Sequence, residues 1–572
     1  MQNFTNKLKG ENFMKKNNKF LFIIIAILVF SVIYLVISLT KNVGKTSSTV
    51  NMENSIKKLD ALYKNINVRN YTISRSNAIT SDEQVTILPD ISEYPFVVNP
   101  TTENFITIYS STEKANEDEN SWLRAVAENF NKSNITVNDM KVSVGIRAIP
   151  SNVAADFITS DKYTPDIYIP SSSIYGLMLD AKEKKYTVAS NSIVNNVSGI
   201  IISKKVKQNI NSKYKNDDAT TVINSVLNGE CIIGYTNPLS NEDGLNYLLM
   251  LLNVFDSTSP LSESAINKLK SYQDKIPYVS YDITQLQDSV QNGTIDGFVS
   301  NYQKYYTTPE LRNNYDFIPF GIVQDNPAYV IGELSNIKNE TLQKFIEYCK
   351  NSNSQTMATN NGFNALTDYK YSGYNFKAND IVDAQTIWKK EKNGSSDLTA
   401  VFVADISGSM EGSPLLKLKA SLNRASTFVD ENTNVGLVTF SDNVNIALPI
   451  AKFDNTQKSY FLNSVKSMRA SGGTAMFDAI IVAEHMLIEQ QQKNPNTRLM
   501  MFVLTDGENN RGYEFEDIEE ISKGLRIPIY TIGYNADIEV LKAVSDINEA
   551  STMDADSDNV IYKLESLFNA QM

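Results

Sequence analysis

The chain has 572 residues, of which 42% are hydrophobic and 21% charged, a composition typical of globular domains with apolar cores. This length predicts three or four domains of about 150 residues each. The formal net charge is -12, and the basic residues 1–19 leave the rest of the chain more acidic still. An acidic body excludes nucleic acid as a partner, because phosphates need a basic surface, but it is compatible with cation binding.

The cysteine and histidine content limits the possible chemistry. The two cysteines, Cys231 and Cys349, exclude a disulfide framework and a cysteine-rich zinc site. We expect two buried free thiols, although pairing stays open. The single histidine, His485, lies in a helical pattern and is expected to be structural. Ser-His and Cys-His catalytic pairs therefore lack their parts, and no P-loop or zinc motif is present, so we predict that the protein is not an enzyme.

A membrane anchor is predicted near the N-terminus. Residues 1–19 form a basic tail, and residues 20–40 are predicted to be a transmembrane helix, since residues 20–39 carry no charge. Five lysines precede this stretch, so the N-terminus should stay in the cytoplasm and the bulk of the chain should be extracellular. No A-x-A-like cleavage site follows, which favours an uncleaved anchor over a signal peptide.

Residues 41–102 are rich in Ser, Thr and Asn and read as a linker or irregular region, with one short helix around "IKKLDALYKNINV". From residue 103, strands ending in hydroxyl residues alternate with helices. Such alternation predicts an α/β fold, in which ligands lie beyond the carboxyl ends of the strands.

Residues 103–380 resemble the bacterial extracellular solute-binding proteins of transporters. The resemblance is carried by "ITIYSSTE", "SGIIISKKV", "GYTNPLSNEDGL", "DGFVSNYQ" and "IPFGIVQDNPAYVI". It implies a two-lobed module of the type II periplasmic-binding-protein class with a ligand cleft. Lobe one would be residues 103–200 plus 322–380, and lobe two residues 201–321. The cysteine to which this family's usual lipid anchor is attached is not found directly after the apolar stretch.

Hydroxyl and amide residues at the strand ends are candidates for lining this cleft. Because free N–H groups at helix N-termini favour negative charge, we expect a small polar or anionic solute. The alternative reading of each residue is helix capping, which the same residue types perform. The candidates are Ser110, Ser111, Ser172, Ser173, Thr236 and Asn237.

A second α/β series follows a helix and polar linker at residues 381–397 and fills residues 398–572. Its strands are expected at 399–404, 434–440, 445–450, 499–505 and 527–533. Its helices are expected at 414–430, 474–490, 515–525, 538–549 and 557–570. This order predicts a doubly wound, mostly parallel sheet with one antiparallel edge strand.

Three loops of this second series carry oxygen side chains. "DISGSM" follows the first strand, "SGGTAMFDAI" opens a helix, and "MMFVLTDGEN" ends a strand at an aspartate. Hydroxyls and carboxylates are hard ligands that suit Mg²⁺, Ca²⁺ or Mn²⁺ rather than Zn²⁺. The candidate metal ligands are Asp405, Ser407, Ser409, Thr474 and Asp506.

These three motifs, in this order, resemble the von Willebrand factor A-type domain and its metal-ion-dependent adhesion site. The resemblance covers residues 398–572 and all five positions match. It implies that Ser407 and Ser409 bind the metal directly, that Thr474 binds it directly or through water, and that both aspartates act mainly through water. It also implies that the metal, most readily Mg²⁺, binds an acidic group of a protein partner.

We therefore expect a membrane-anchored extracellular binding protein. The alternative function is solute capture or sensing by the cleft of residues 103–380, with the A-type domain as a coupling or assembly module. A competing cation site is the stretch "DADSDNVIYKLE", Asp554–Glu565, which nearly fits an EF-hand calcium loop. The same stretch also reads as the start of the last helix.

Overall fold

The computed structural model describes residues 51–70, 88–118, 121–276, 279–280, 283–394, 396–507, 509–534, 536, 538–548, 550, 552–554 and 567–568. Among these residues, none of the helices is long and apolar enough to span a bilayer. The predicted span at residues 20–40 lies outside the described residues, and so does most of the stretch Asp554–Glu565.

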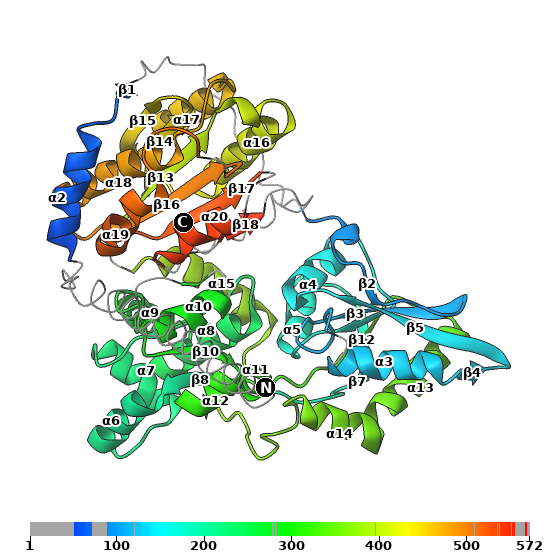
Figure 1. The fold of residues 1–572 in the computed structure, drawn as a ribbon. Helices are drawn as coiled ribbons and strands as arrows, with labels where there is room; N and C mark the ends of the chain where they lie inside the picture. Colours follow the sequence, from blue (N-terminus) through cyan, green and yellow to red (C-terminus); the bar gives the residue numbers. More distant parts are fainter. Residues whose placement is uncertain are drawn as a thin grey trace, which may run out of the picture.

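The first lobe is a mixed sheet covered by helices on both faces (Figure 1). Its strands, in spatial order, are β2 (Phe96–Val98), β5 (Met140–Ala148), β3 (Asn104–Ser110), β6 (Ile167–Ile169), β12 (Ala328–Ile331) and β7 (Tyr186–Ser190), with β4 (Thr136–Val137) paired to β5. One face packs against α3 (Trp122–Lys132), α13 (Asn336–Lys350) and α14 (Ser352–Asn360), and the other against α4 (Ser151–Thr159) and α5 (Ile174–Ala181). A short 3-10 helix, η1 (Ile91–Glu93), precedes β2.

The second lobe has a smaller sheet of four strands. Their order is β11 (Tyr315–Pro319), β8 (Ser198–Ser203), β10 (Gly297–Asn301) and β9 (Ile233–Gly234). Its helices are α6 (Lys204–Tyr214), α7 (Ala219–Leu227), α8 (Glu242–Phe255), α9 (Glu263–Gln273), α10 (Ile283–Gln291), α11 (Tyr302–Thr307) and α12 (Pro309–Asn314). The chain passes from lobe one to lobe two near Asn196 and returns near Gln324, and these two crossings meet at a β-bridge between the two residues.

Helix α15 (Ala378–Glu391) occupies most of the segment expected to connect the two modules. It is not a free linker, because Ile381, Ala384 and Trp388 are fully buried in the core of the second lobe. The indole Nε1 of Trp388 donates to the hydroxyl of Tyr235 at 2.9 Å. The helix therefore belongs to the two-lobed module.

The C-terminal domain is a seven-stranded sheet between two helical layers (Figure 1). Its strand order is β1 (Val68–Asn70), β15 (Val444–Lys452), β14 (Asn434–Phe440), β13 (Leu398–Asp405), β16 (Arg498–Thr505), β17 (Ile529–Gly533) and β18 (Thr552–Asp554). One face packs on α16 (Ser413–Phe428) and α17 (Asn455–Ser467), and the other on α18 (Met476–Lys493), α19 (Phe515–Leu525) and α20 (Ile538–Asp546). The pairs around β13, β16 and β17 are parallel, and β15 runs antiparallel to β14.

Part of the region expected to be a linker at residues 41–102 is built into this domain. Helix α2 (Met52–Tyr63) buries Leu59 against the α18 and α19 layer, and β1 adds a parallel strand beside β15. The predicted short helix is present, but its packing was not expected. Helix α17 was not predicted, and it buries Gln457, Phe461 and Val465 at a spacing of four residues.

Candidate functional site

The two candidate aspartates lie at the same edge of the C-terminal sheet. Strands β13 and β16 are adjacent and parallel, with Ala404 opposite Leu504, so both end at this edge. Asp405 is the last residue of β13, and Asp506 follows the last residue of β16. Burial is the main cause of the raised pKa of Asp405, and the charge of the nearby Asp506 adds a smaller contribution in the same direction.

The carboxylate of Asp405 is 0% exposed and is held by two hydrogen bonds. The backbone N–H of Ser407 donates to Oδ1 at 2.7 Å, and the hydroxyl of Thr505 donates to Oδ2 at 2.6 Å. Burial raises the pKa of Asp405 to about 6, although these hydrogen bonds oppose the shift. A cation at this edge would offset the cost of burying the charge.

The two serine hydroxyls of "DISGSM" converge on one point. Ser407 Oγ and Ser409 Oγ lie 3.0 Å apart, with Ser407 buried and Ser409 exposed. Gly408 between them begins a short 3-10 turn, η2 (Gly408–Met410). This turn lets residues two apart present their side chains to the same side.

The loop that carries Thr474 is fastened to both other loops. Gly408 donates its N–H to the carbonyl of Gly472 at 2.9 Å, which joins this loop to "DISGSM". The N–H of Thr474 donates to Oδ1 of Asn510 at 2.9 Å, and the N–H of Asn510 donates to the carbonyl of Thr474 at 3.0 Å. The buried Thr474 is thereby held between the serines and the loop after Asp506.

Asp506 supplies the observation that tests whether a cation fits here. It is 8% exposed, and its Oδ1 is buried without a hydrogen-bond partner among the described residues. A buried carboxylate oxygen needs a donor or a cation. With Asp405 and the hydroxyls beside it, the donor set consists of hard oxygens, as Mg²⁺, Ca²⁺ and Mn²⁺ prefer. The five residues fit such an ion.

Several residues that hold this site were not predicted from the sequence. Thr505 orients Asp405, and Asn509 accepts the N–H of Met476 at the start of α18 at 3.0 Å. Asp442, in the loop between β14 and β15, accepts the N–H of Gly473 at 2.8 Å. Thr505 and Asn509 could have been suspected from the sequence, because both lie within three residues of Asp506 in "LTDGENN".

These features coincide with a match to a known domain family. Residues 400–570 match the family model of the von Willebrand factor type A domain. The C-terminal part of the expected combination is confirmed, and we refer to residues 398–572 as the A-type domain.

A curated relative is a von Willebrand factor A domain-containing protein of Dictyostelium discoideum. It is 30% identical over 150 residues, which is 25% of this chain but only 15% of that protein. The similarity therefore concerns a part of that relative and not its whole length.

Solved structures match both parts of the chain. They include a von Willebrand factor type A protein from Catenulispora acidiphila, with 18% identity and a TM-score of 0.28 over 30% of this chain and 42% of that one. They also include a putative extracellular solute-binding protein from Bordetella parapertussis, with 14% identity and a TM-score of 0.37 over 50% of this chain and 99% of that one. Solute-binding proteins are thus among the structural matches, as the resemblance of residues 103–380 implied.

The six predicted cleft residues are only partly brought together. A cavity of about 530 Å³, open to solvent, lies between the lobes, and of the six only Ser111 lines it. The others have local bonds: Ser110 Oγ donates to the carbonyl of Ser111, Ser172 Oγ accepts the N–H of Ile174, and the N–H of Ser173 donates to Asp325. Thr236 Oγ1 donates to Asn241 Oδ1, and Asn237 Oδ1 accepts the N–H of Leu239. Capping and turn bonds therefore account for most of them.

The residues that do line the cavity come from both lobes. Lobe one contributes the loop after β3 and the segments around α4 and α5, and lobe two contributes the start of α8 and Asn301. The lining residues are Ser111, Thr112, Glu113, Pro150, Ser151, Asn152, Ser171, Tyr175, Ser240, Asn241, Glu242, Asp243, Asn301 and Gln324. The acidic members lie in "SSTEK" and "SNEDG", beside the hydroxyl and amide residues that were predicted to line the cleft.

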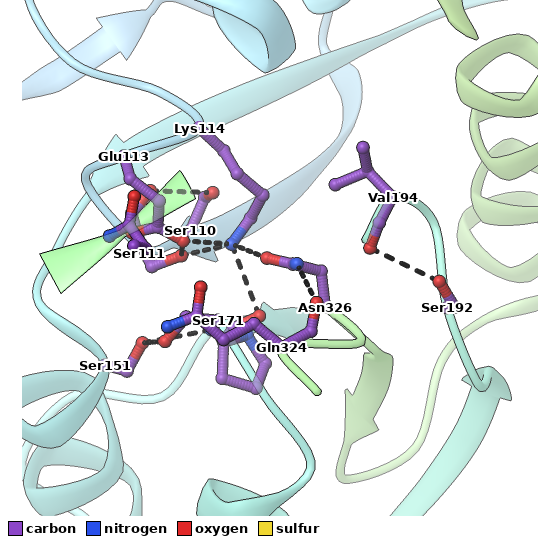
Figure 2. Close-up of polar contacts among 12 residues, drawn as sticks. Ser110, Ser111, Glu113, Lys114, Ser151, Ser171, Ser192, Val194, Gln324 and Asn326 are labelled. Atoms are coloured by element: carbon purple, nitrogen blue, oxygen red, sulfur yellow. Dashed lines mark hydrogen bonds and ion pairs between the residues drawn. The ribbon is translucent and has the colours of Figure 1, made fainter. Parts of the chain in front are cut away.

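Lys114 forms the polar support behind this cavity (Figure 2). Its ammonium is fully buried and donates to Ser111 Oγ, to Glu113 Oε1 at 3.0 Å and to Asn326 Oδ1 at 2.7 Å. It also donates to the carbonyl of Pro170 at 3.3 Å. Burial lowers the pKa of Lys114, and the nearby Glu113 opposes that shift. Through these bonds, Lys114 joins the loops after β3 and β6 to the segment around Asn326, where the chain returns from lobe two to lobe one.

The two cysteines and the single histidine lie where the sequence predicted them to lie. Cys231 and Cys349 are buried free thiols, as expected, and burial raises the pKa of Cys231 to about 12. His485 lies on α18, as expected, and its ring stacks on Tyr63 of α2.

Proposed function

We propose that the A-type domain binds a divalent cation through Asp405, Ser407, Ser409, Thr474 and Asp506, and that the bound cation captures an acidic group of a protein partner. The observation that carries the proposal is the buried, unpartnered Oδ1 of Asp506. It lies at the sheet edge where Asp405 and the two serine hydroxyls also meet. Two carboxylates balance the charge of the ion, and the hydroxyls leave it able to accept a further anionic oxygen.

The protein acts as a binding protein in this proposal and not as a catalyst. The proposed partner contributes a carboxylate, because a hard cation with an open position attracts a hard, negatively charged oxygen. Mg²⁺ is the proposed ion, with Ca²⁺ or Mn²⁺ as alternatives. The proposed location is the cell membrane, with residues 20–40 as a single-pass anchor, the N-terminus in the cytoplasm and residues 41–572 outside.

Titration calorimetry on the full chain in detergent tests the cation. Mg²⁺, Mn²⁺ and Ca²⁺ are titrated into the wild-type protein, into Asp405→Ala and into Ser407→Ala. Asp383→Ala, which removes an exposed carboxylate on α15, is the matched control. Binding that both site variants lose and the control keeps supports the proposal. Binding that survives in both site variants contradicts it and directs attention to Asp554–Glu565.

A second candidate function is solute capture by the two-lobed module. The specific observation that favours it is the solvent-connected cavity between the lobes, which is lined almost entirely by polar side chains. In that case the A-type domain would couple or assemble the module with other proteins. Thermal unfolding of the full chain in the presence of small solutes tests this function independently of the cation.

A further inference from the structure

The cavity between the lobes has a distinct charge. Its described lining includes the three carboxylates of Glu113, Glu242 and Asp243, and it includes no lysine, arginine or histidine. The nearest basic group, Lys114, is fully buried and already bonded to four oxygen atoms behind the cavity. An anionic solute would meet repulsion here, so of the polar and anionic solutes expected from the sequence, the charge of the lining disfavours the anionic ones.

Two of the three carboxylates are already bonded to their own surroundings. Asp243 accepts from Ser198 Oγ at 2.7 Å, from Gln324 Nε2 at 2.8 Å and from Asn301 Nδ2 at 2.9 Å. Glu113 accepts from Ser111 Oγ at 2.5 Å and from Lys114. These bonds fix the two side chains in place and link both lobes to the cavity wall.

Glu242 differs from them. It is the first residue of α8, only 9% exposed, and neither carboxylate oxygen has a hydrogen-bond partner among the described residues. Burial, with the charges of Glu113 and Asp243, raises the pKa of Glu242 well above its usual value. The hydroxyl of Ser172 and the positive charge of the buried Lys114 oppose this shift in part, but neither makes a hydrogen bond to the carboxylate oxygens of Glu242. A buried carboxylate that faces a cavity without a partner calls for a cationic ligand.

We propose that this cavity binds a small organic cation, whose ammonium group pairs with the carboxylate of Glu242. This inference rests on the solute-capture function and adds the class of solute to it. Tyr175 and the hydroxyl and amide side chains of the lining supply an aromatic ring and further acceptors for such a ligand.

A metal ion fits this cavity less well than an ammonium group. Asp243 and Glu113 are already held by the hydrogen bonds described above, so Glu242 is the carboxylate of the lining whose oxygens have no hydrogen-bond partner among the described residues. Ca²⁺ takes six to eight oxygen ligands and Mg²⁺ six. An ammonium group needs one carboxylate and a few neutral acceptors, which is what Glu242 and its neighbours offer.

Thermal unfolding of the full chain in detergent tests the proposal, with choline, putrescine and spermidine as probes against matched sodium chloride. A cation present at about 100 times its Kd should raise Tm by about 5 °C. Glu242→Gln should remove this shift, and Glu347→Gln, which removes an exposed carboxylate on α13, should retain it.

Other outcomes overturn the proposal in distinguishable ways. Stabilisation by sulfate or citrate, with none from the three cations, contradicts the cationic class and leaves solute capture standing. A shift with cations that persists in Glu242→Gln places them elsewhere. If neither the cations nor the anions stabilise the chain, the cationic class is wrong, while the A-type cation site is unaffected.

Discussion

The hydroxyl of Thr505, the last residue of β16, donates a 2.6 Å hydrogen bond to Oδ2 of Asp405, the last residue of β13. This bond joins the two central strands at the edge where the proposed cation binds. It also leaves Oδ1 of Asp405 to accept the N–H of Ser407. Thr505 is therefore a positioning residue for the proposed site.

Thr505→Val should lower Mn²⁺ affinity about 10- to 100-fold, because residues that orient metal-site side chains contribute that much. Thr505→Ser keeps the hydroxyl and should bind nearly as well as the wild type. Titration calorimetry of the two variants measures the difference. Equal affinities in the valine and serine variants would show that the hydrogen bond does not position Asp405 for the cation.

The buried Glu484 of α18 should make stability depend on pH. Burial raises its pKa to about 8, and the nearby Ser522 opposes this only in part. The unfolded chain loses this proton near pH 4.5, while the folded chain keeps it until about pH 8. The free energy of unfolding should therefore fall by about 1.4 kcal/mol per pH unit between these values.

Glu484→Gln should abolish that dependence and stabilise the protein at pH 8 relative to the wild type. Urea unfolding at pH 5, 6.5 and 8 measures it, with Glu489→Gln, an exposed neighbour on the same helix, as the control. The same pH slope in wild type and Glu484→Gln would show that this carboxyl does not titrate in the window.

Helix α2 should behave as part of the A-type domain. Leu59 is fully buried against the α18 and α19 layer, and the ring of Tyr63 stacks on His485 with centroids 3.8 Å apart. Leu59→Ala should destabilise the domain by about 2–5 kcal/mol, as a buried large-to-small change does. Met52→Ala, at a residue 39% exposed on the same helix, should change stability little. Similar unfolding midpoints for the two variants would mean that α2 is dispensable.

Arg498 should fix the A-type domain to the second lobe. Its guanidinium donates to the carbonyl of Gln273 at 2.5 Å and to that of Ile276 at 3.3 Å, at the end of α9. Arg498→Ala should leave both carbonyls without this donor and loosen the contact, and Lys523→Ala, an exposed change on α19, should not. Hydrogen exchange at residues 270–276 should rise several-fold in the first variant only. Unchanged exchange there would show that the contact is weak.

The A-type site could be predicted from the sequence because each of its residues lies next to a strand or helix that the local sequence pattern predicts. Buried parallel strands end at one edge, so residues after two such strands, Asp405 and Asp506, must come close together. The contacts that hold them could not be anticipated in this way. Thr505 looks like any residue of a buried strand until its partner across the sheet is known. Helix α2 is docked by Leu59 against helices more than 400 residues later in the chain.

The residues of the cleft were harder to predict, because hydroxyl and acidic residues after strands can either bind a ligand or stabilise the start of a helix. Hydroxyls after strands also cap helices and turns: Ser172 accepts the N–H of Ile174, and Thr236 donates to Asn241, the N-cap of α8. The acids of "NEDGL" resemble the usual acidic first turn of a helix, which favours the dipole. Glu242 can be recognised as a cavity residue without a hydrogen-bond partner only when the arrangement of the two lobes is known.

Anomalous diffraction from crystals of the full chain soaked in Mn²⁺ tests the proposed cation site most directly. The account predicts a single strong peak within about 2.3 Å of the hydroxyl oxygens of Ser407 and Ser409, with Asp405, Thr474 and Asp506 around it. A strong peak elsewhere, for example along residues 554–565, together with none beside Ser407, would contradict it.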